Sequence, residues 1–391
     1  MEIKKIFIGG WFQRTILHLV EIYDFLNGNE SPLDLNAKKL NTLRRNMAID
    51  RLKLNVGNFE YIEIVNKENI IAKIYEDGLI VLNKDYENIK EDISELTGYY
   101  EKKLSPAINY IFSLGAPVPK ELANIKTIYP YFVVLEKASR QDIFNLLEDF
   151  EQSKYFEIVE NDFEIYRGDK LYIINNLNVS PGAIEKMINE QIFFREFSGQ
   201  LHRYLNLHRI IWEKIAVVKE KGQIKGSEVD PFKTKIEGYN KTINLIGSRI
   251  NQMGVYIGTR GSIAASDKEM DRFIKILKFK YDTLSDTLIY IKELWAMTKN
   301  YVESALDLFT AIQAKSTEST VKNLTVITSM GVGATLIGLF TEKKFPDFTW
   351  FGVLYFFILA FIGYSADKII KYAQKKKRYK VFDVDYDKNI N

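Results

Sequence analysis

Arginine and aromatic residues occur together in two parts of the chain, and this combination is suited to binding a nucleotide. Trp11 and Arg14 lie near the first apolar run, and Arg195 and Arg203 lie on a helical stretch rich in Phe, Tyr and Trp. A guanidinium can pair with a phosphate, while an aromatic ring can stack on a base. Surfaces between packed helices have the same composition, so both interpretations stay open.

A further arginine, Arg260, lies within residues 258–262, whose sequence is Gly-Thr-Arg-Gly-Ser. If this segment precedes a long helix, its backbone N–H groups could hold a phosphate at the start of that helix, with the arginine beside them. A simple turn between two helices is the alternative, and it is the more common origin of such a segment.

Two acidic residues, Asp282 and Asp286, lie one helical turn apart. Their carboxylates could hold a divalent cation at an interface between subunits. A solvated helix face balanced by Lys278 and Lys280 explains the same pattern. The chain has no cysteine, which excludes thiolate catalysis and Cys-ligated metals, and it contains no phosphate-binding loop, GxSxG motif or histidine pairing of a catalytic kind. The sequence therefore predicts no enzyme.

The elements that must position these residues change in character along the chain. Residues 1–180 alternate short β-like runs with amphipathic helical runs, which indicates a cytoplasmic α/β domain and an α+β fold class. A turn at Glu76-Asp77-Gly78 joins two of the predicted strands. The predicted strands are 6–8, 61–65, 70–75, 79–82, 128–135, 156–159 and 171–174, and the predicted helices are 15–26, 89–114 and 142–150.

Residues 181–322 are predicted to form a helical stalk region. Helical patterns cover 181–221 and 232–253, a glycine-containing turn is expected at 254–261, and one uninterrupted helix is expected from 266 to 341. Such a helix would be about 110 Å long at its usual rise. A helix of that length needs partners, so we expect oligomeric packing.

Two stretches without any charged residue follow, 324–341 and 348–366. Each approaches the ~20 residues that cross a bilayer, and the basic residues of the tail place both termini in the cytoplasm. We therefore predict a two-helix transmembrane hairpin in the cell (inner) membrane. The hairpin has a first transmembrane helix at 323–341, an outer loop at 342–347 and a second transmembrane helix at 348–366, and a basic cytoplasmic tail follows at 367–391.

The first uncharged stretch carries a stripe of threonines. At helical steps of three and four, one face presents Val321, Thr325, Thr328, Val332, Thr335 and Leu339. Such residues can serve close helix packing, or they can line a pore. The second stretch has aromatic residues on all sides, which is typical of a lipid-facing helix and favours the pore for the first.

The order of these parts resembles the CorA-like divalent metal ion transporters. In that family a cytoplasmic α/β domain leads into a very long stalk helix, which continues into the first of two spans and is followed by a short outer loop, a second span and a lysine-rich C-terminus. Residues 322–325 look like the family's K-x-L-T motif, Thr335 lies where the family has a pore-facing threonine, and residues 375–378 are similar to its terminal basic ring. The resemblance implies a homopentamer that transports magnesium or another divalent cation.

The chain departs from this family at the signature. Glu342, Lys343 and Lys344 stand where the family has Gly-Met-Asn, followed by a matching Phe345. In the family these three residues form the outer filter that holds a hydrated cation, and a ring of lysines would repel one. The sequence also resembles divergent CorA-like proteins found beside type III CRISPR systems. These lack the signature and are thought to be membrane effectors gated by a nucleotide second messenger.

Three functions are therefore predicted as alternatives. The first is a homo-oligomeric channel or ion transporter that is gated by its cytoplasmic domain. The second is a nucleotide-gated membrane effector in antiviral defence, and the third is a membrane-anchored interaction protein without a pore. The expected partners are the lipid bilayer and further copies of the chain, and the expected ligand is a divalent cation or a nucleotide. A net charge of +3 does not indicate binding to a nucleic acid polymer.

Overall fold

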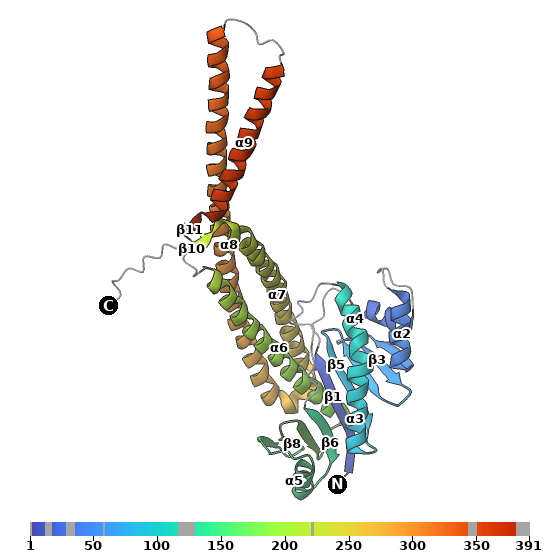
Figure 1. Ribbon diagram of the computed structural model, residues 1–391. Coiled ribbons are helices and arrows are strands. Elements are labelled where there is room, and N and C mark those ends of the chain that lie inside the picture. Colours follow the sequence, from blue (N-terminus) through green and yellow to red (C-terminus); the bar gives the residue numbers. More distant parts are fainter. Residues whose placement is uncertain are drawn as a thin grey trace, which may run out of the picture. The chain divides into compact units, whose positions relative to one another are not determined.

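The computed structural model describes residues 2–11, 18–28, 36–57, 59–115, 130–219, 223–342 and 350–380 (Figure 1). The chain divides into two compact units. The first contains Met1–Leu205 and Ser248–Lys292, and the second contains Asn206–Gly247 and Glu293–Asn391. Helices α6, α7 and α8 each contribute residues to both units.

A nine-stranded sheet forms the centre of the first unit, with the strand order β2-β3-β4-β5-β1-β6-β9-β8-β7. All neighbouring strands are antiparallel except β6 and β9, which are parallel. The predicted turn at 76–78 is confirmed, because it joins β4 to β5 and Gly78 adopts a φ of 91°. The strands are β1 (Glu2–Trp11), β2 (Ile49–Asn55), β3 (Tyr61–Asn66), β4 (Ile71–Tyr75), β5 (Leu79–Asp85), β6 (Tyr131–Glu136), β7 (Phe156–Val159), β8 (Phe163–Arg167) and β9 (Leu171–Asn176).

Residues that alternate along β1, β3, β4 and β5 point to two opposite faces of the sheet, and helices pack on both faces. Ile62, Ile64 and Ile74 belong to a core with the helices that follow β1 and β5, and in Figure 1 α3 and α4 cover this face. On the other face α6 approaches so closely that a Cβ at Gly9 would lie 3.1 Å from the side chain of Ile192. The helices of the first face are α1 (Leu19–Asn27), α2 (Ala37–Met47), α3 (Ile89–Tyr99), a π-helical turn (Tyr100–Leu104) and α4 (Ser105–Gly115).

A second, smaller core lies under helix α5 (Arg140–Asp149), where Ile143 and Leu147 pack on β6 and β9. Ser139 caps α5. Its side chain accepts a hydrogen bond from the backbone N–H of Asp142, and the side chain of Asp142 accepts one from the backbone N–H of Ser139. The predictions for α5 and for strands β6, β7 and β9 are confirmed, whereas β2 and β8 were not predicted. Strand β2 lies at the edge of the sheet and carries Asp50, Arg51 and Lys53, which weaken its apolar pattern.

Three long helices follow the sheet. They are α6 (Pro181–Lys219), α7 (Gly226–Ser266) and α8 (Ile274–Glu342). The turn predicted at 254–261 is wrong, because α7 continues through these residues and ends only at Ser266. A short 3-10 turn, Lys268–Phe273, then leads into α8. The predicted glycine turn is helical because tertiary contacts outweigh the modest cost of glycine in a helix.

The second unit packs α6, α7 and α8 around apolar side chains such as Ile215, Ile243 and Phe309. Trp212 of α6 stacks on Tyr301 of α8, with ring centroids 4.3 Å apart. Helix α9 (Trp350–Lys376) follows, and a two-stranded ribbon pairs β10 (Gln223–Lys225) with β11 (Arg378–Lys380).

Among the residues that the structure describes, no helix combines the length and the apolar character that a membrane span requires. The predicted outer loop lies outside the described residues from position 343 onwards, as do the side chains at 335, 339 and 342.

Candidate functional site

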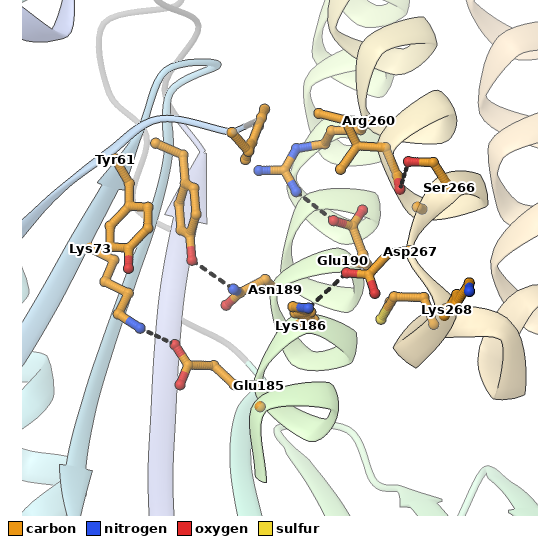
Figure 2. Close-up of a pocket in the computed structure, with 16 residues that line it drawn as sticks. Tyr61, Lys73, Glu185, Lys186, Asn189, Glu190, Arg260, Ser266, Asp267 and Lys268 are labelled. Carbon is orange, nitrogen blue, oxygen red and sulfur yellow. Dashed lines mark hydrogen bonds and ion pairs between the residues drawn. The ribbon is translucent and has the colours of Figure 1, made fainter. Parts of the chain in front are cut away.

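A cavity of about 630 Å³ lies in the first unit, between strands β3 and β4 and helices α6 and α7 (Figure 2). Aromatic side chains come from the strands, and charged side chains come mainly from the helices. The volume of the cavity is within the range of small-molecule sites, ≈ 300–1,000 Å³.

The strand wall of the cavity follows from the period of two along β3 and β4. Ile62 and Ile74 point into the core, so Tyr61, Lys73 and Tyr75 point to the opposite face. The ring of Tyr75 is stacked on that of Phe59, with centroids 5.5 Å apart, and lies 5.3 Å from that of Tyr61. The two strands, together with Phe59 just before β3, therefore bring three aromatic rings into contact on this wall.

Helix α6 forms a polar wall of the cavity. Four polar residues lie on one face of this helix, and they are Glu185, Lys186, Asn189 and Glu190. Glu185 forms an ion pair with Lys73 of β4. The side-chain amide of Asn189 donates to the hydroxyl of Tyr75 at 2.8 Å, while its own oxygen is buried without a partner among the described residues. These contacts fix α6 against the strands.

The residues that follow α7 close the third side. The ammonium group of Lys186 lies 2.7 Å from Asp267 and 2.6 Å from Glu269. The hydrogen bond from Lys186 lowers the pKa of Asp267, and the two carboxylates raise the pKa of Lys186. Lys268, which lies between these two carboxylates in the sequence, is exposed and forms no ion pair with another described residue.

Arg260 is the most buried charge on the cavity wall, with 3% of its side chain exposed. Its guanidinium donates two hydrogen bonds to Asp77, in the β4–β5 turn, and one to Glu190 at 2.7 Å. It also lies over the rings of Phe59 and Phe193, 4.6 and 4.5 Å from their centroids. Burial alone would lower the pKa of Arg260, but Asp77 and Glu190 raise it, so the arginine stays charged.

Glu190 connects the cavity to α8. Burial raises the pKa of Glu190, and the charge of Arg260 together with the hydroxyl of Tyr281 partly offset this. The Tyr281 hydroxyl, which belongs to α8, donates its hydrogen bond to Glu190. One carboxylate on the cavity wall thus bonds both to α7 and to α8.

Two of the predicted ligand-binding residues, Trp11 and Arg260, converge on Asp77 beside the cavity. The indole N–H of Trp11 donates to the backbone oxygen of Asp77 at 2.9 Å, and Arg260 binds the side chain of the same residue. Trp11 is buried among Phe193 and Phe197, so its ring serves as core beside the cavity. Arg260 lines the cavity, but from within α7, so the predicted backbone phosphate site at a helix start is wrong.

The other predicted ligand-binding residues lie elsewhere. Arg195 bonds Glu196 and the backbone oxygens of Gly9 and Pro130, which ties α6 to the sheet. Arg203 is half-buried on α6 and does not line the cavity, and Arg14 lies outside the described residues.

The two acidic residues predicted as metal ligands, Asp282 and Asp286, are both exposed on α8. In the described ranges of the chain, no group of three or more His, Asp or Glu side chains is arranged to hold a metal ion. Asp267 and Glu269, near the start of the same helix, bind Lys186.

Most of the cavity was missed by sequence reasoning, although signals for it exist. On β3 and β4 polar and aromatic residues largely alternate with apolar ones, and on α6 four polar residues lie at neighbouring helical positions. What the sequence does not show is that these two faces meet.

No protein-family model matches the chain, and no curated protein matches it. Among solved structures, the chain is similar to the CorA magnesium transporter from Methanocaldococcus jannaschii, with 10% sequence identity, 64% of this chain and 91% of that chain covered, and a TM-score of 0.28. A TM-score this low supports no conclusion about fold or function. The function must therefore be inferred from the residues of the chain and their arrangement.

Proposed function

We propose that the chain forms a homo-oligomeric membrane channel of CorA-like organisation, in which one face of α8 lines the pore and the sheet-containing unit controls its opening. The observation that carries this proposal is an exposed stripe on α8. Within the second unit, residues at alternating steps of four and three are all exposed. They are Glu293, Met297, Asn300, Ser304, Asp307, Ala311, Ala314, Glu318, Val321, Thr325, Thr328 and Val332.

This spacing averages 3.5 residues, which is the repeat of helices that wind around one another. The opposite face of α8 is already buried, with Val302, Phe309 and Ile312 in the core of the unit. The stripe is therefore an exposed face that other copies of the chain can reach. Its small and polar composition differs from the leucine-rich seam of a closed coiled coil and suits a hydrated channel axis.

The stripe ends in the residues predicted to line the pore. Val321, Thr325, Thr328 and Val332 are exposed and continue its spacing without a break. A single helix that carries the same face from the cytoplasmic region into the span can transmit a tilt from one to the other.

Helix α9 supports placement in a bilayer. Large apolar side chains are exposed along it, including Trp350 at 80%, Phe357 at 64% and Phe361 at 70%. An exposed apolar surface of this kind needs lipid or protein to cover it. Lys375 and Lys376 follow in its last turn, as the positive-inside tendency requires for a cytoplasmic end.

Single cysteines test the stripe directly, because the chain has none of its own. Asn300→Cys and Asp307→Cys lie on the stripe, while Lys299→Cys and Thr310→Cys are also exposed but lie roughly 80–100° away around the helix. In protein reconstituted into liposomes, a short bis-maleimide should link copies through the stripe positions and not through the other two. Equal cross-linking at all four cysteine positions, or cross-linking at none of them, would contradict the proposed homo-oligomer.

Channel activity is measured on the same liposomes with dyes for K⁺, Mg²⁺ and Cl⁻. We expect flux in at least one of these assays, and block by a thiol reagent at Thr328→Cys. Absence of flux together with stripe-specific linking would favour the membrane-anchored interaction protein without a pore.

A further inference from the structure

The end of helix α9 and the ribbon beside it carry a dense cluster of positive charge. The chain as a whole is nearly balanced, with 54 basic and 51 acidic residues, but residues 350–380 contain seven basic residues and a single acidic one, Asp367. The exposed basic side chains of this stretch, together with one from β10, form a basic patch. Its members are Lys225, Lys368, Lys371, Lys375, Lys376, Lys377 and Arg378.

We infer that the basic patch binds the phosphate groups of anionic phospholipids. The bound lipids belong to the leaflet on the side of the sheet-containing unit, and the patch makes the protein selective for negatively charged membranes. This inference rests on the part of the proposed function that places α9 in a bilayer. It adds the chemical class of lipid that surrounds the end of that helix.

The two-stranded ribbon holds part of the patch on the surface. Ile224 of β10 and Tyr379 of β11 are directly opposite each other, and both are buried. The neighbouring pair, Lys225 and Arg378, has both side chains exposed, as the period of two along a strand requires. The ribbon therefore separates its apolar residues from its charges and presents two adjacent cations on one side.

The positive charges of the patch lack compensation by carboxylates. Within the described chain, no carboxylate is paired with Lys375, Lys376 or Arg378. In the first unit, by contrast, Lys84 and Lys186 each contact at least two carboxylates at 2.6–2.8 Å. A group of like charges without internal partners creates a positive potential that attracts anions.

Aromatic side chains relate the patch to the apolar part of α9. Phe361 is exposed, and Tyr364 and Tyr372 are exposed further along the helix. The ammonium group of Lys368 lies 4.9 Å from the ring centroid of Tyr364, and that of Lys376 lies 4.6 Å from the ring centroid of Tyr372. Tyrosine and lysine both place an apolar part towards lipid and a polar end towards water. The patch therefore begins where the phosphate layer of a bilayer would lie.

The exposed apolar residues next to the patch favour a lipid over a nucleic acid. A nucleic acid would neutralise the lysines but leave Phe357 and Phe361 uncovered. A phospholipid satisfies both, because its acyl chains cover the apolar face while its phosphate meets the ammonium groups. Clusters of four to eight basic residues directly beside a span have this effect on anionic lipids.

Native mass spectrometry of the full chain in detergent tests the selectivity, with phosphatidylglycerol and phosphatidylcholine offered at equal concentration. We expect phosphatidylglycerol to bind about tenfold more tightly, and the preference to decrease as the salt concentration rises. A variant with four glutamines in the patch should lose the preference, and one with arginine at the same positions should keep it. The four positions are Lys225, Lys371, Lys375 and Lys376.

A matched control removes the same number of charges from the first unit. This variant replaces four exposed lysines by glutamine and should retain the preference for phosphatidylglycerol. The replaced residues are Lys38, Lys53, Lys90 and Lys102. A melting temperature close to that of the parent shows that each variant is folded.

Equal binding of the two lipids would overturn the inference, and so would a preference that the patch variant retains. Two further probes distinguish other sources of phosphate. Glycerol phosphate binding as tightly as phosphatidylglycerol would indicate a site for free phosphate, and tighter binding of a short single-stranded RNA would assign the patch to nucleic acid. Either result would reject the lipid.

Lipid binding is counted without any measurement of flux. A failed flux assay therefore leaves the lipid site standing, and equal binding of the two lipids leaves the channel proposal standing.

Discussion

Arg260 and Asp77 lie 183 residues apart in the sequence and form a two-bond, almost fully buried ion pair. Asp77 belongs to the turn between β4 and β5, and Arg260 belongs to α7. Glu190 of α6 accepts a further bond from the same guanidinium. One arginine thus holds the sheet, α6 and α7 together beside the cavity.

Removing this arginine should destabilise the first unit strongly. Arg260→Met leaves the carboxylates of Asp77 and Glu190 buried without their cation, and breaking a buried pair in this way costs about 3–5 kcal/mol. We expect a large drop in the melting temperature of the purified protein in detergent. Arg51→Met is the matched control, because Arg51 is exposed and its contact with Asp50 is 3.9 Å long. A drop of similar size in both variants would contradict the role given to Arg260.

Lys280 should make stability depend on pH in the alkaline range. Burial, with repulsion from Arg167 as a smaller contribution, lowers the pKa of Lys280 from 10.5 to about 8. Between these values the unfolded chain binds more protons than the folded one, so stability rises as the pH increases through this window. The free-energy cost of burying the charged Lys280 side chain is fully present below pH 8.

Lys280→Met removes that cost. The variant should be more stable than the parent by about 1–3 kcal/mol at pH 7, with the difference shrinking as the pH approaches 10.5. Denaturant unfolding at several pH values measures it, with Lys278→Met as the exposed control. A variant less stable than the parent at pH 7 would show that the hydrogen bond from Lys280 to Gln191 outweighs the burial.

Gly9 and Gly98 should respond to alanine in opposite directions. A Cβ at Gly9 would lie 2.5 Å from the backbone oxygen of Ile80, which the paired strands prevent from moving. Overpacking of this kind costs about 1–3 kcal/mol. A Cβ at Gly98, near the end of α3, meets nothing within 4 Å, so Gly98→Ala should stabilise by about 0.5–1 kcal/mol. Thermal unfolding compares the two, and destabilisation by both would contradict the open space at Gly98.

The ribbon of β10 and β11 should be detectable by a disulfide. Lys225 and Arg378 are directly opposite each other in this antiparallel pair. Opposed residues have Cα atoms about 4.5–5.5 Å apart, within the range that a disulfide spans. Lys225→Cys with Arg378→Cys should therefore lose its free thiols under mild oxidation within one chain. The pair Lys225→Cys with Ile369→Cys, the second position lying on exposed α9, should keep them. Free thiols in both pairs would contradict the ribbon.

Local sequence determined the elements that depend on periodicity alone. The alternation at 61–65 and 70–75, the turn at Asp77-Gly78 and the helical patterns of α3, α5 and α6 were each readable, because a strand or helix repeats its environment every two or 3.6 residues. The long exposed stripe on α8 was partly readable for the same reason, through the threonines at its end.

Tertiary structure decided where these faces meet. Arg260 was recognised as a candidate, but its partners Asp77 and Glu190 are brought to it only when α7 packs against the sheet and α6. Contacts of this kind depend on chain closure over long separations in the sequence, which no local pattern encodes. The same reason explains the misplaced turn at 254–261. Packing on neighbouring helices keeps the glycine-rich part of α7 helical, and the chain turns only after Ser266, next to the cavity.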